Sequence, residues 1–150
     1  TDFQAALGLS QMERLDWSLK RRNEIAALYN RLFADNFDAD EIRPLALKPN
    51  SNHAWHLYVI RLDTEKLKVD RKQFIEELRA RGIGTSVHFI PLHIHPFYRD
   101  TYHYQPNDYP VSFRVYKQIV SLPVYSKMSV DDAYRVVDGV KEVIEKNRAS

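Results

Sequence analysis

The sequence lacks cysteine altogether, and it has no long apolar run. Without thiols, a disulfide framework and a thiolate metal site are both excluded, and the composition is typical of a reducing cytosol. No apolar stretch approaches the roughly 20 residues that span a bilayer. The first residues also lack the basic segment followed by an apolar one that is typical of a secretory signal. We therefore expect a cytoplasmic protein without a membrane partner.

The chain also lacks an excess of charge of either sign. Its 150 residues carry 22 basic and 20 acidic side chains, for a net charge of +2. That balance argues against nucleic acid or an anionic membrane surface as a partner. With 44% hydrophobic and 28% charged residues, the composition is that of a folded globular protein, and the length suits a single domain.

Glycine is scarce. The four glycines are Gly8, Gly82, Gly84 and Gly139. They form no glycine-rich loop that could cradle a phosphate, and no Gly-x-Ser-x-Gly elbow is present to expose a nucleophilic serine. Taken residue by residue, the chain contains no complete catalytic set, and we expect no catalytic residue in it.

The first third of the chain has apolar residues at helical spacing, and no proline interrupts residues 1–43. Thr1 and Gln4 fit a capping box at the start of this pattern. The pattern predicts one long helix, or two nearly coaxial ones, ending near Ala34. A helix of about 34 residues would be ~50 Å long, which is typical of a helix that bridges two domains or subunits. Because the chain opens inside a helix, we expect it to be trimmed from a longer protein.

The rest of the chain alternates between short strands and helices. β-branched and aromatic content predicts strands over residues 56–62, 83–89 and 119–123. Helices are predicted over about 71–81, 111–117 and 130–145. Residues 35–54 and 95–110 are predicted as loops, the second of which has one helical turn. Strands and helices mix without a βαβ alternation. This order predicts an α+β fold with a small, mainly antiparallel sheet and helices packed on one side.

Capping patterns fix the ends of two of these helices. Asp70 with Gln73, and Ser129 with Asp132, have the spacing of capping boxes, and Gly82 has the position of a glycine that ends a helix. The predicted core face of the 71–81 helix is Phe74, Ile75 and Leu78. That of the last helix is Val130, Ala133, Val137, Val140 and Ile144.

Histidines are concentrated in residues 88–95. His93 and His95 lie two apart in a segment predicted to be extended, so they would point the same way, and imidazole is a common metal ligand. A metal site needs a third ligand, and Asp100 is the sole carboxylate nearby, so we expect no metal site. Two interpretations stay open for these histidines: they bond to the backbone, or they form part of a ligand-facing rim with neighbouring aromatic residues.

Several ordered motifs resemble one known family, the sugar aminotransferases named after DegT, DnrJ, EryC1 and StrS. Residues 1–9 are similar to the segment that leads from that family's large cofactor domain into its small C-terminal domain. Residues 82–93 with Pro96-Phe97-Tyr98 resemble its most recognisable C-terminal stretch. Further matches are residues 56–62, Tyr109-Pro110, 119–124 and 129–132. The resemblance covers essentially the whole chain.

The resemblance implies the small domain of a fold-type-I enzyme that uses pyridoxal phosphate (PLP). Such an enzyme moves an amino group, typically from glutamate, onto a keto-sugar attached to a nucleotide diphosphate. In the family, the lysine that binds PLP and the acid beside the cofactor's ring nitrogen both lie in the large domain. No lysine here sits in a sequence like the family's cofactor site. We therefore expect residues 1–150 to be the small domain alone, without bound cofactor and inactive by itself.

The resemblance also implies which residues contact substrate. His88, Phe89, His93 and Tyr98 are expected near the mouth of the site, where the small domain closes over the substrate. Phe89 stands where the family usually has tyrosine, so one hydroxyl is lost. None of the four is expected to transfer a proton.

Two other interpretations stay open. Family members that carry histidine in place of the lysine dehydrate sugars instead, and these residues do not distinguish the two activities. The chain is alternatively a non-catalytic module that binds a nucleotide sugar. The apolar face of the first helix would need a partner, so we expect a homodimer or higher oligomer. That face comprises Phe3, Leu7, Leu9 and Met12.

Overall fold

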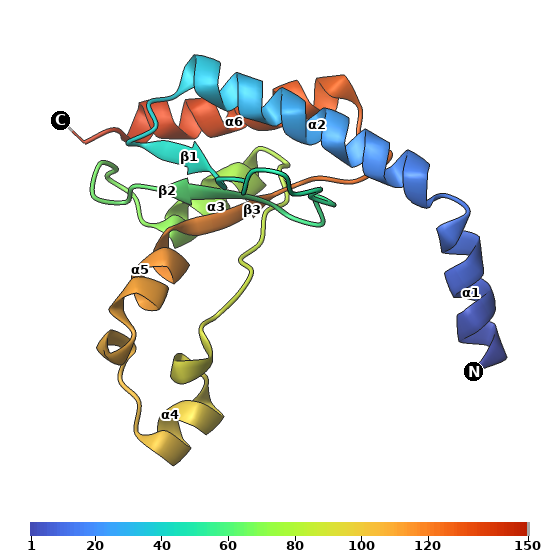
Figure 1. The fold of residues 1–150 in the computed structure, drawn as a ribbon. Coiled ribbons are helices and arrows are strands. Elements are labelled where there is room, and N and C mark those ends of the chain that lie inside the picture. Colours follow the sequence, from blue (N-terminus) through green and yellow to red (C-terminus); the bar gives the residue numbers. More distant parts are fainter. Residues whose placement is uncertain (150) are drawn as a thin grey trace.

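The computed structural model describes residues 1–149. Its elements in chain order are α1 (Asp2–Met12), α2 (Leu15–Asn36), β1 (Ile42–Pro44), β2 (Tyr58–Leu62), α3 (Arg71–Ala80), a 3-10 turn (Leu92–Ile94), α4 (Pro96–Tyr102), a second 3-10 turn (Pro106–Asp108), α5 (Pro110–Gln118), β3 (Ile119–Leu122) and α6 (Val130–Asn147) (Figure 1). The predicted α+β class with a small antiparallel sheet is confirmed.

The sheet has the strand order β1-β2-β3, with both pairs antiparallel. Side chains alternate along the central strand β2: Tyr58, Ile60 and Leu62 are fully buried, whereas Val59 and Arg61 are half-buried. Because alternate residues of a strand face opposite sides, the sheet has a core face and a second face. We call the second one the distal face; it bears Val59 and Arg61.

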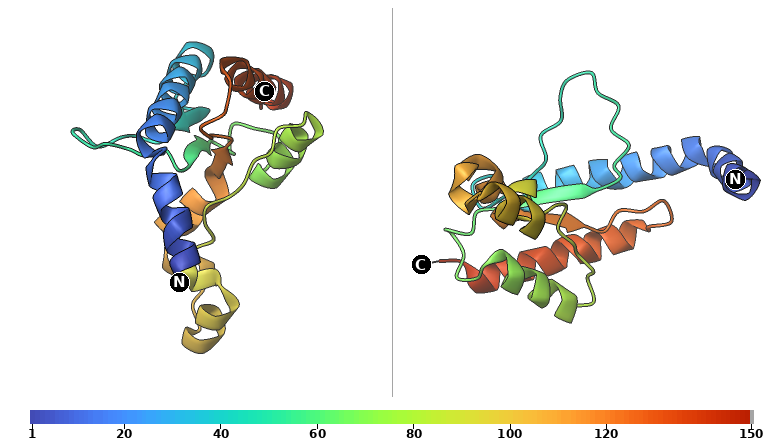
Figure 2. Two further views of the ribbon diagram at one scale, coloured as in Figure 1. Left: turned by 90° about the vertical axis from the view of Figure 1, so that its right-hand side faces the viewer. Right: turned by 90° about the horizontal axis from the view of Figure 1, so that it is seen from below.

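Helices α2, α3 and α6 cover the core face, and α5 lies on the other side of the sheet (Figure 2). The core is centred on an aromatic contact between α2 and β2, where the rings of Tyr29 and Tyr58 are 4.7 Å apart. Phe33 and Trp55 extend the cluster, at 6.2 and 5.4 Å from Tyr58. From the other side of α2, α6 adds the buried residues Ala133, Val136, Val137, Val140, Val143 and Ile144.

Both core tyrosine hydroxyls have partners. The Tyr29 hydroxyl donates to the carbonyl oxygen of Pro123 at 2.9 Å, and the Tyr58 hydroxyl donates to Oδ1 of Asn30 at 2.8 Å. Burial raises the pKa of Tyr29 and of Tyr58 well above the usual range. Both phenols therefore stay protonated and act as hydrogen-bond donors within the core.

The predicted capping patterns are confirmed. The Asp70 side chain accepts from the backbone N of Gln73 at 2.8 Å and begins α3. Ser129 Oγ accepts from the backbone N of Asp132 at 3.0 Å and begins α6. Gly82 follows α3 with a φ of 73°, a left-handed conformation that glycine adopts without strain.

The long N-terminal helix is interrupted, and the prediction of one helix or two coaxial ones was wrong. The backbone N of Arg14 donates to the carbonyl of Gln11, three residues earlier, which ends the regular hydrogen bonds of α1. Helix α1 then points away from the direction of α2 (Figure 1). The apolar residues of α2 pack on the sheet, whereas α1 buries no residue. With nothing to pack against, the apolar pattern of α1 does not hold the two helices in line.

The predicted strand over 83–89 reduces to one bridge, between Ser86 and Ser121. The next hydrogen-bonded pairs of this register would be Gly84 with Pro123 and His88 with Ile119. Pro123 has no N–H to donate, and the N–H of Ile119 is already donated to the carbonyl of Val115 in α5. The ladder therefore cannot extend in either direction.

Three smaller expectations were also wrong. Ile42–Pro44, predicted as loop, pairs with β2 as β1, because Ile42 reaches the core. The 95–110 loop contains α4, seven residues long, which starts at a proline suited to a first helical position. Val130 is half exposed rather than buried, since it is the first residue of α6.

Residues 91–110 leave the body of the protein as a separate projection, which we call the aromatic lobe. It contains both 3-10 turns and α4, and the chain returns to the sheet through α5 (Figure 1). Together with α1, it extends beyond the layers formed by the sheet and by helices α2, α3 and α6.

Replacing Tyr29 with Phe should show how much the core depends on the Tyr29 hydroxyl. Tyr29→Phe keeps the ring contacts but leaves the Pro123 carbonyl without its donor, so we expect a loss of about 1–2 kcal/mol in unfolding free energy. The matched control is Tyr134→Phe, on the exposed side of α6, which should change it by less than about 0.5 kcal/mol. Urea denaturation measures both, and equal effects would contradict this account of the core.

Candidate functional site

His88 lies at the base of the extended segment that leads to the aromatic lobe. It is half-buried, and its Nδ1 is 2.9 Å from Oγ of Ser121. Ser121 is on β3, where it pairs with Val59 on the distal face. The backbone bridge between Ser86 and Ser121 holds the segment that contains His88 against β3, two residues before His88. The imidazole is therefore held at a defined place beside the sheet.

Phe89 follows directly and faces the opposite environment. Its side chain is 74% exposed, and its ring meets the His88 ring edge-on at 4.6 Å. An exposed aromatic ring beside a fixed imidazole offers a flat apolar surface next to a polar one. This pair can contact a polar ring such as a sugar or a base.

His93 lies inside the aromatic lobe and is only 6% exposed. Its Nε2 is 3.2 Å from the carbonyl oxygen of Pro106, and its ring is 4.9 Å from that of Tyr109. These contacts join the start of the lobe to its end. Direct substrate contact by His93 stays a prediction, while its burial and hydrogen bond give it a positioning role within the lobe.

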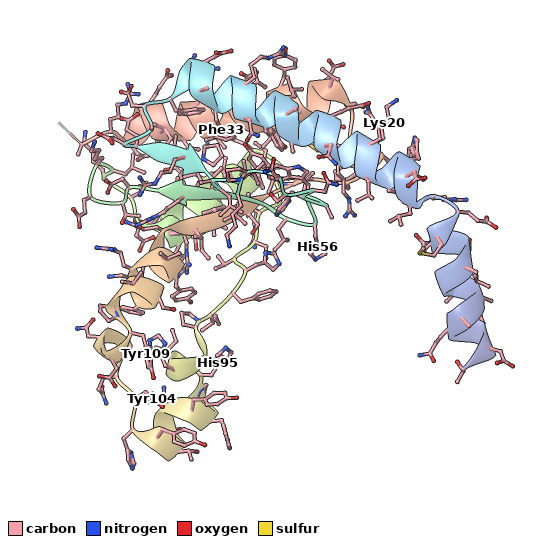
Figure 3. All side chains as sticks on the ribbon, in the orientation of Figure 1. Lys20, Phe33, His56, His95, Tyr104 and Tyr109 are labelled. Carbon is pink, nitrogen blue, oxygen red and sulfur yellow. The ribbon has the colours of Figure 1, made fainter. Side chains whose placement is uncertain are left out.

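Tyr98 belongs to a chain of neighbouring rings that runs through the lobe. Successive centroids are 4.9 to 6.3 Å apart along Phe97, Tyr98, Tyr102, Tyr104, Tyr109 and His93. The interaction of Tyr104 with the Tyr109 hydroxyl raises the pKa of Tyr104. Figure 3 labels His95, Tyr104 and Tyr109, which gather in this projection. The lobe is thus a largely aromatic surface held together by ring contacts.

The four predicted site residues fall into two groups. His88 and Phe89 lie at the sheet end of the segment, and His93 and Tyr98 lie in the aromatic lobe. The partners that hold them were not predicted: Ser121 for His88, and Pro106 with Tyr109 for His93. One signal was available for Ser121, because it is the single polar residue within an otherwise apolar strand.

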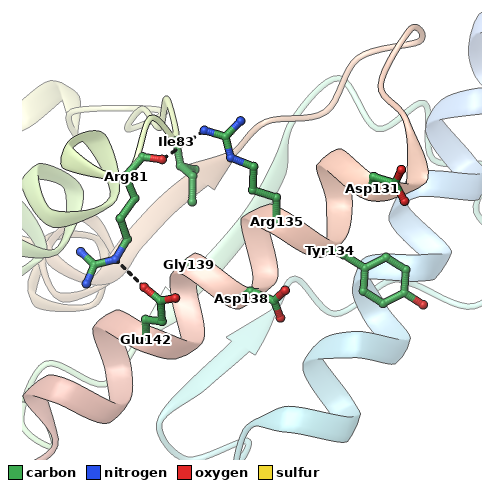
Figure 4. A pocket seen from close by; sticks show the side chains of 8 residues that line it. All are labelled: Arg81, Ile83, Asp131, Tyr134, Arg135, Asp138, Gly139 and Glu142. Carbon is green, nitrogen blue, oxygen red and sulfur yellow. Dashed lines mark hydrogen bonds and ion pairs between the residues drawn. The ribbon is translucent and has the colours of Figure 1, made fainter.

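A separate hollow lies elsewhere, along the outer side of α6. It has a volume of about 590 Å³ and is lined by Arg81, Ile83, Asp131, Tyr134, Arg135, Asp138, Gly139 and Glu142 (Figure 4). Three of its polar residues contact one another: Arg81 Nε contacts Glu142 Oε2 at 3.0 Å, and Arg135 donates to the Arg81 carbonyl at 3.3 Å. None of the predicted site residues reaches it.

Within residues 1–149, no three His, Asp or Glu side chains are close enough together to hold a metal ion. Among the same residues, no helix has the length and apolar character needed to cross a bilayer.

The lysines do not fit the covalent attachment of PLP. A lysine that forms such a link needs a desolvated pocket or a neighbouring charge that favours its neutral form. Every lysine in residues 1–149 is exposed except Lys141, which is half-buried and donates to Oδ1 of Asn36 at 3.2 Å. The lysines within residues 1–149 therefore offer PLP no covalent anchor of this kind.

A sequence model of the DegT/DnrJ/EryC1/StrS aminotransferase family matches residues 1–141, and the chain belongs to this family. The predicted resemblance is confirmed. The fold is similar, over 97% of the chain, to Spr1654 of Streptococcus pneumoniae, which is assigned as a sugar aminotransferase, with a TM-score of 0.85 and 31% identity. That protein has been solved in PMP and PLP forms, and the family is PLP-dependent.

Two curated relatives are similar in sequence. An uncharacterized protein of Methanocaldococcus jannaschii, MJ1066, is 47% identical over 148 residues, covering 99% of this chain and 38% of that protein. The spore coat polysaccharide biosynthesis protein SpsC of Bacillus subtilis is 43% identical over 145 residues, covering 96% of this chain and 36% of that protein. The chain thus spans little more than a third of these relatives, and it covers 36% of Spr1654.

The contact between His88 and Ser121 can be tested by NMR. Ser121→Ala removes the Oγ partner of Nδ1, so we expect the Nδ1 resonance and the tautomer balance of His88 to change. Ser112→Ala, on the exposed side of α5, is the matched control and should leave both unchanged. The measurement is the ¹⁵N spectrum of the imidazole nitrogens; an unchanged His88 in Ser121→Ala would show that the hydroxyl does not position the ring.

Proposed function

We propose that residues 1–150 form the small C-terminal domain of a PLP-dependent aminotransferase that acts on nucleotide-linked keto-sugars. One observation carries the proposal: a fold that matches nearly the whole chain fills only 36% of a protein assigned as a sugar aminotransferase. The substrate class is supported by two relatives, whose names refer to spore coat polysaccharide and to the biosynthesis of pseudoaminic acid. On this proposal, the protein works in amino-sugar or polysaccharide biosynthesis.

The proposed role of this domain is to shape the substrate side of the pocket. His88, fixed by Ser121, offers a directed nitrogen, and the exposed ring of Phe89 offers a flat apolar contact. Tyr98 adds a partly exposed phenol from α4, and His93 keeps the aromatic lobe folded. These groups bind and orient a ligand, and none is assigned proton transfer.

Bound PLP supplies the electron sink that amino-group transfer requires. The lysine and the acid that hold the cofactor are proposed to lie in the part of the protein outside residues 1–150. This placement agrees with the surface position of the lysines described above. The chain alone is therefore proposed to be inactive, while the whole protein would take a nucleotide sugar and an amino donor as substrates, in the cytoplasm.

Helix α1 provides the proposed contact with the rest of the assembly. Phe3, Leu7, Leu9 and Met12 are 53 to 73% exposed, and α1 buries no residue. Exposed apolar side chains on more than one side of a helix are stabilised when other surfaces cover them. The remaining domain or a second copy of the protein would fill that role, which supports a homodimer or higher oligomer.

The proposal is tested by treating the 150-residue chain with PLP and borohydride, followed by peptide mapping. We expect no stoichiometric adduct at any single lysine, because within residues 1–149 every lysine is exposed except Lys141, which bonds to Asn36. Turnover of glutamate with a nucleotide-linked keto-sugar should also be absent. A one-to-one adduct at one lysine, or measurable turnover, would contradict the proposed division of the protein.

Two alternatives are separated by different observations. A sugar dehydratase of the same family would carry histidine in place of lysine at the cofactor position of the longer protein, which its sequence would reveal directly. A self-standing nucleotide-sugar-binding module would bind such sugars without a cofactor. Titration calorimetry of the chain with several nucleotide sugars would give saturable heat in that case.

A further inference from the structure

Three arginines gather on the distal face of the sheet. Arg43 of β1 and Arg61 of β2 are directly paired across the two strands. Both point away from the core, because their neighbours Ile42, Ile60 and Leu62 are buried on the other face. Two like charges directly opposite each other on antiparallel strands are destabilising unless something neutralises them.

Helix α5 adds the third arginine. Arg61 Nε donates to Oε1 of Gln118 at 2.6 Å, which brings α5 against this part of the sheet. Arg114 lies four residues before Gln118, so the two side chains share one side of the helix. Arg114 therefore lies about one helical turn from the contact between Arg61 and Gln118. Partial burial lowers the pKa of Arg61, and the positive charges of Arg43 and Arg114 lower it further.

These charges lack acidic partners. Among the ion pairs within residues 1–149, none involves Arg43, Arg61 or Arg114. Asp63 favours the charged form of Arg61 without forming an ion pair with it, and its carboxylate accepts from the backbone N of Glu65 at 3.1 Å. Apart from the bond to Gln118, no hydrogen bond within the described residues occupies the three guanidinium groups.

A hollow of about 440 Å³ opens beside the paired arginines. Its lining combines Arg43 and Arg61 with mainly apolar residues from the sheet, the following loop and α5: Pro44, Leu45, Ala46, Val59, Ile60, Val115 and Ile119. A concave, mainly apolar hollow with a few convergent polar groups is the usual form of a small-molecule site. Its volume is within the range of such sites.

We propose that this hollow binds a phosphate or diphosphate group, held by the two arginines of its lining, Arg43 and Arg61, with Arg114 as a further positive charge on the neighbouring helix. Guanidinium groups match the oxygens of a phosphate in pairs, and an anion between the paired arginines would remove their mutual repulsion. The apolar wall formed by Pro44, Leu45 and Val115 would accommodate the body of a phosphorylated small molecule. The site uses none of His88, Phe89, His93 and Tyr98, and it does not depend on the proposed function.

The site adjoins the His88 group on the same face of the sheet. Ser121, which holds His88, pairs with Val59, and Ile119 pairs with Arg61. The Val59–Ser121 pair and the Arg61–Ile119 pair are two residues apart along each strand, or about 7 Å. A ligand that carries both a phosphate and a sugar could therefore reach both groups at once.

Binding is tested by calorimetry of the 150-residue chain with pyrophosphate at low ionic strength. We expect saturable one-to-one binding, weakened about five- to tenfold in each of Arg43→Gln and Arg61→Gln. Arg79→Gln, an exposed arginine of α3 without an ion pair, is the matched control with the same loss of charge. An equal loss in Arg79→Gln would show diffuse charge attraction, and no binding by the unmodified chain would overturn the proposal.

Thermal stability supplies a second, independent readout. Without pyrophosphate, Arg43→Gln relieves the repulsion and should raise the melting temperature by about 1–3 °C at low salt. With saturating pyrophosphate the unmodified chain should have the higher melting temperature, because it binds the ligand more tightly and is stabilised more by it. A variant that is less stable under both conditions would contradict the proposal. Tighter binding of a polyglutamate peptide than of pyrophosphate would also overturn it, by showing that the face binds acidic protein.

Discussion

The contact between α2 and the central strand holds the rest of the structure in place. Tyr29 packs on Tyr58 with ring centroids 4.7 Å apart, and its hydroxyl reaches across to the carbonyl of Pro123 just after β3. A buried aromatic pair of this kind contributes about 0.5–1.5 kcal/mol beyond its burial. The Tyr29 side chain thus joins α2 to β2 and to the end of β3. This attachment keeps the core face of the sheet against the helices and leaves the distal face turned away from α2.

With the core face filled by helices, the groups suited to ligand binding collect on and beyond the other face. Ser121 and Arg61 alternate with buried neighbours along β3 and β2, so both belong to the distal face. From there the chain continues through His88 into the aromatic lobe, whose rings are joined by His93. Helix α1 and the aromatic lobe extend from different ends of the body formed by the sheet and helices α2, α3 and α6 (Figure 1).

Local sequence patterns predicted the class of fold, the caps of α3 and α6, and the exposure of the apolar residues of α1. They did not predict features that depend on the pairing of distant residues. The bond between His88 and Ser121 joins residues 33 apart in the chain, and the pairing of Arg43 with Arg61 depends on a strand of three residues. The predicted strand over 83–89 shows the same limit. To pair further with it, β3 would need backbone N–H donors at Pro123 and Ile119. Pro123 has no N–H, and the N–H of Ile119 already donates to the carbonyl of Val115.

The proposal made above is that a self-contained body presents α1 and the aromatic lobe to the rest of a larger protein. Amide hydrogen exchange of the isolated 150-residue chain, followed segment by segment, tests it most directly. Residues in β2, α6 and the second half of α2 should be protected nearly to the level of global unfolding, and α1 should exchange close to the rate of an unfolded chain. Protection of α1 equal to that of α6, in a chain shown to be monomeric, would contradict the claim.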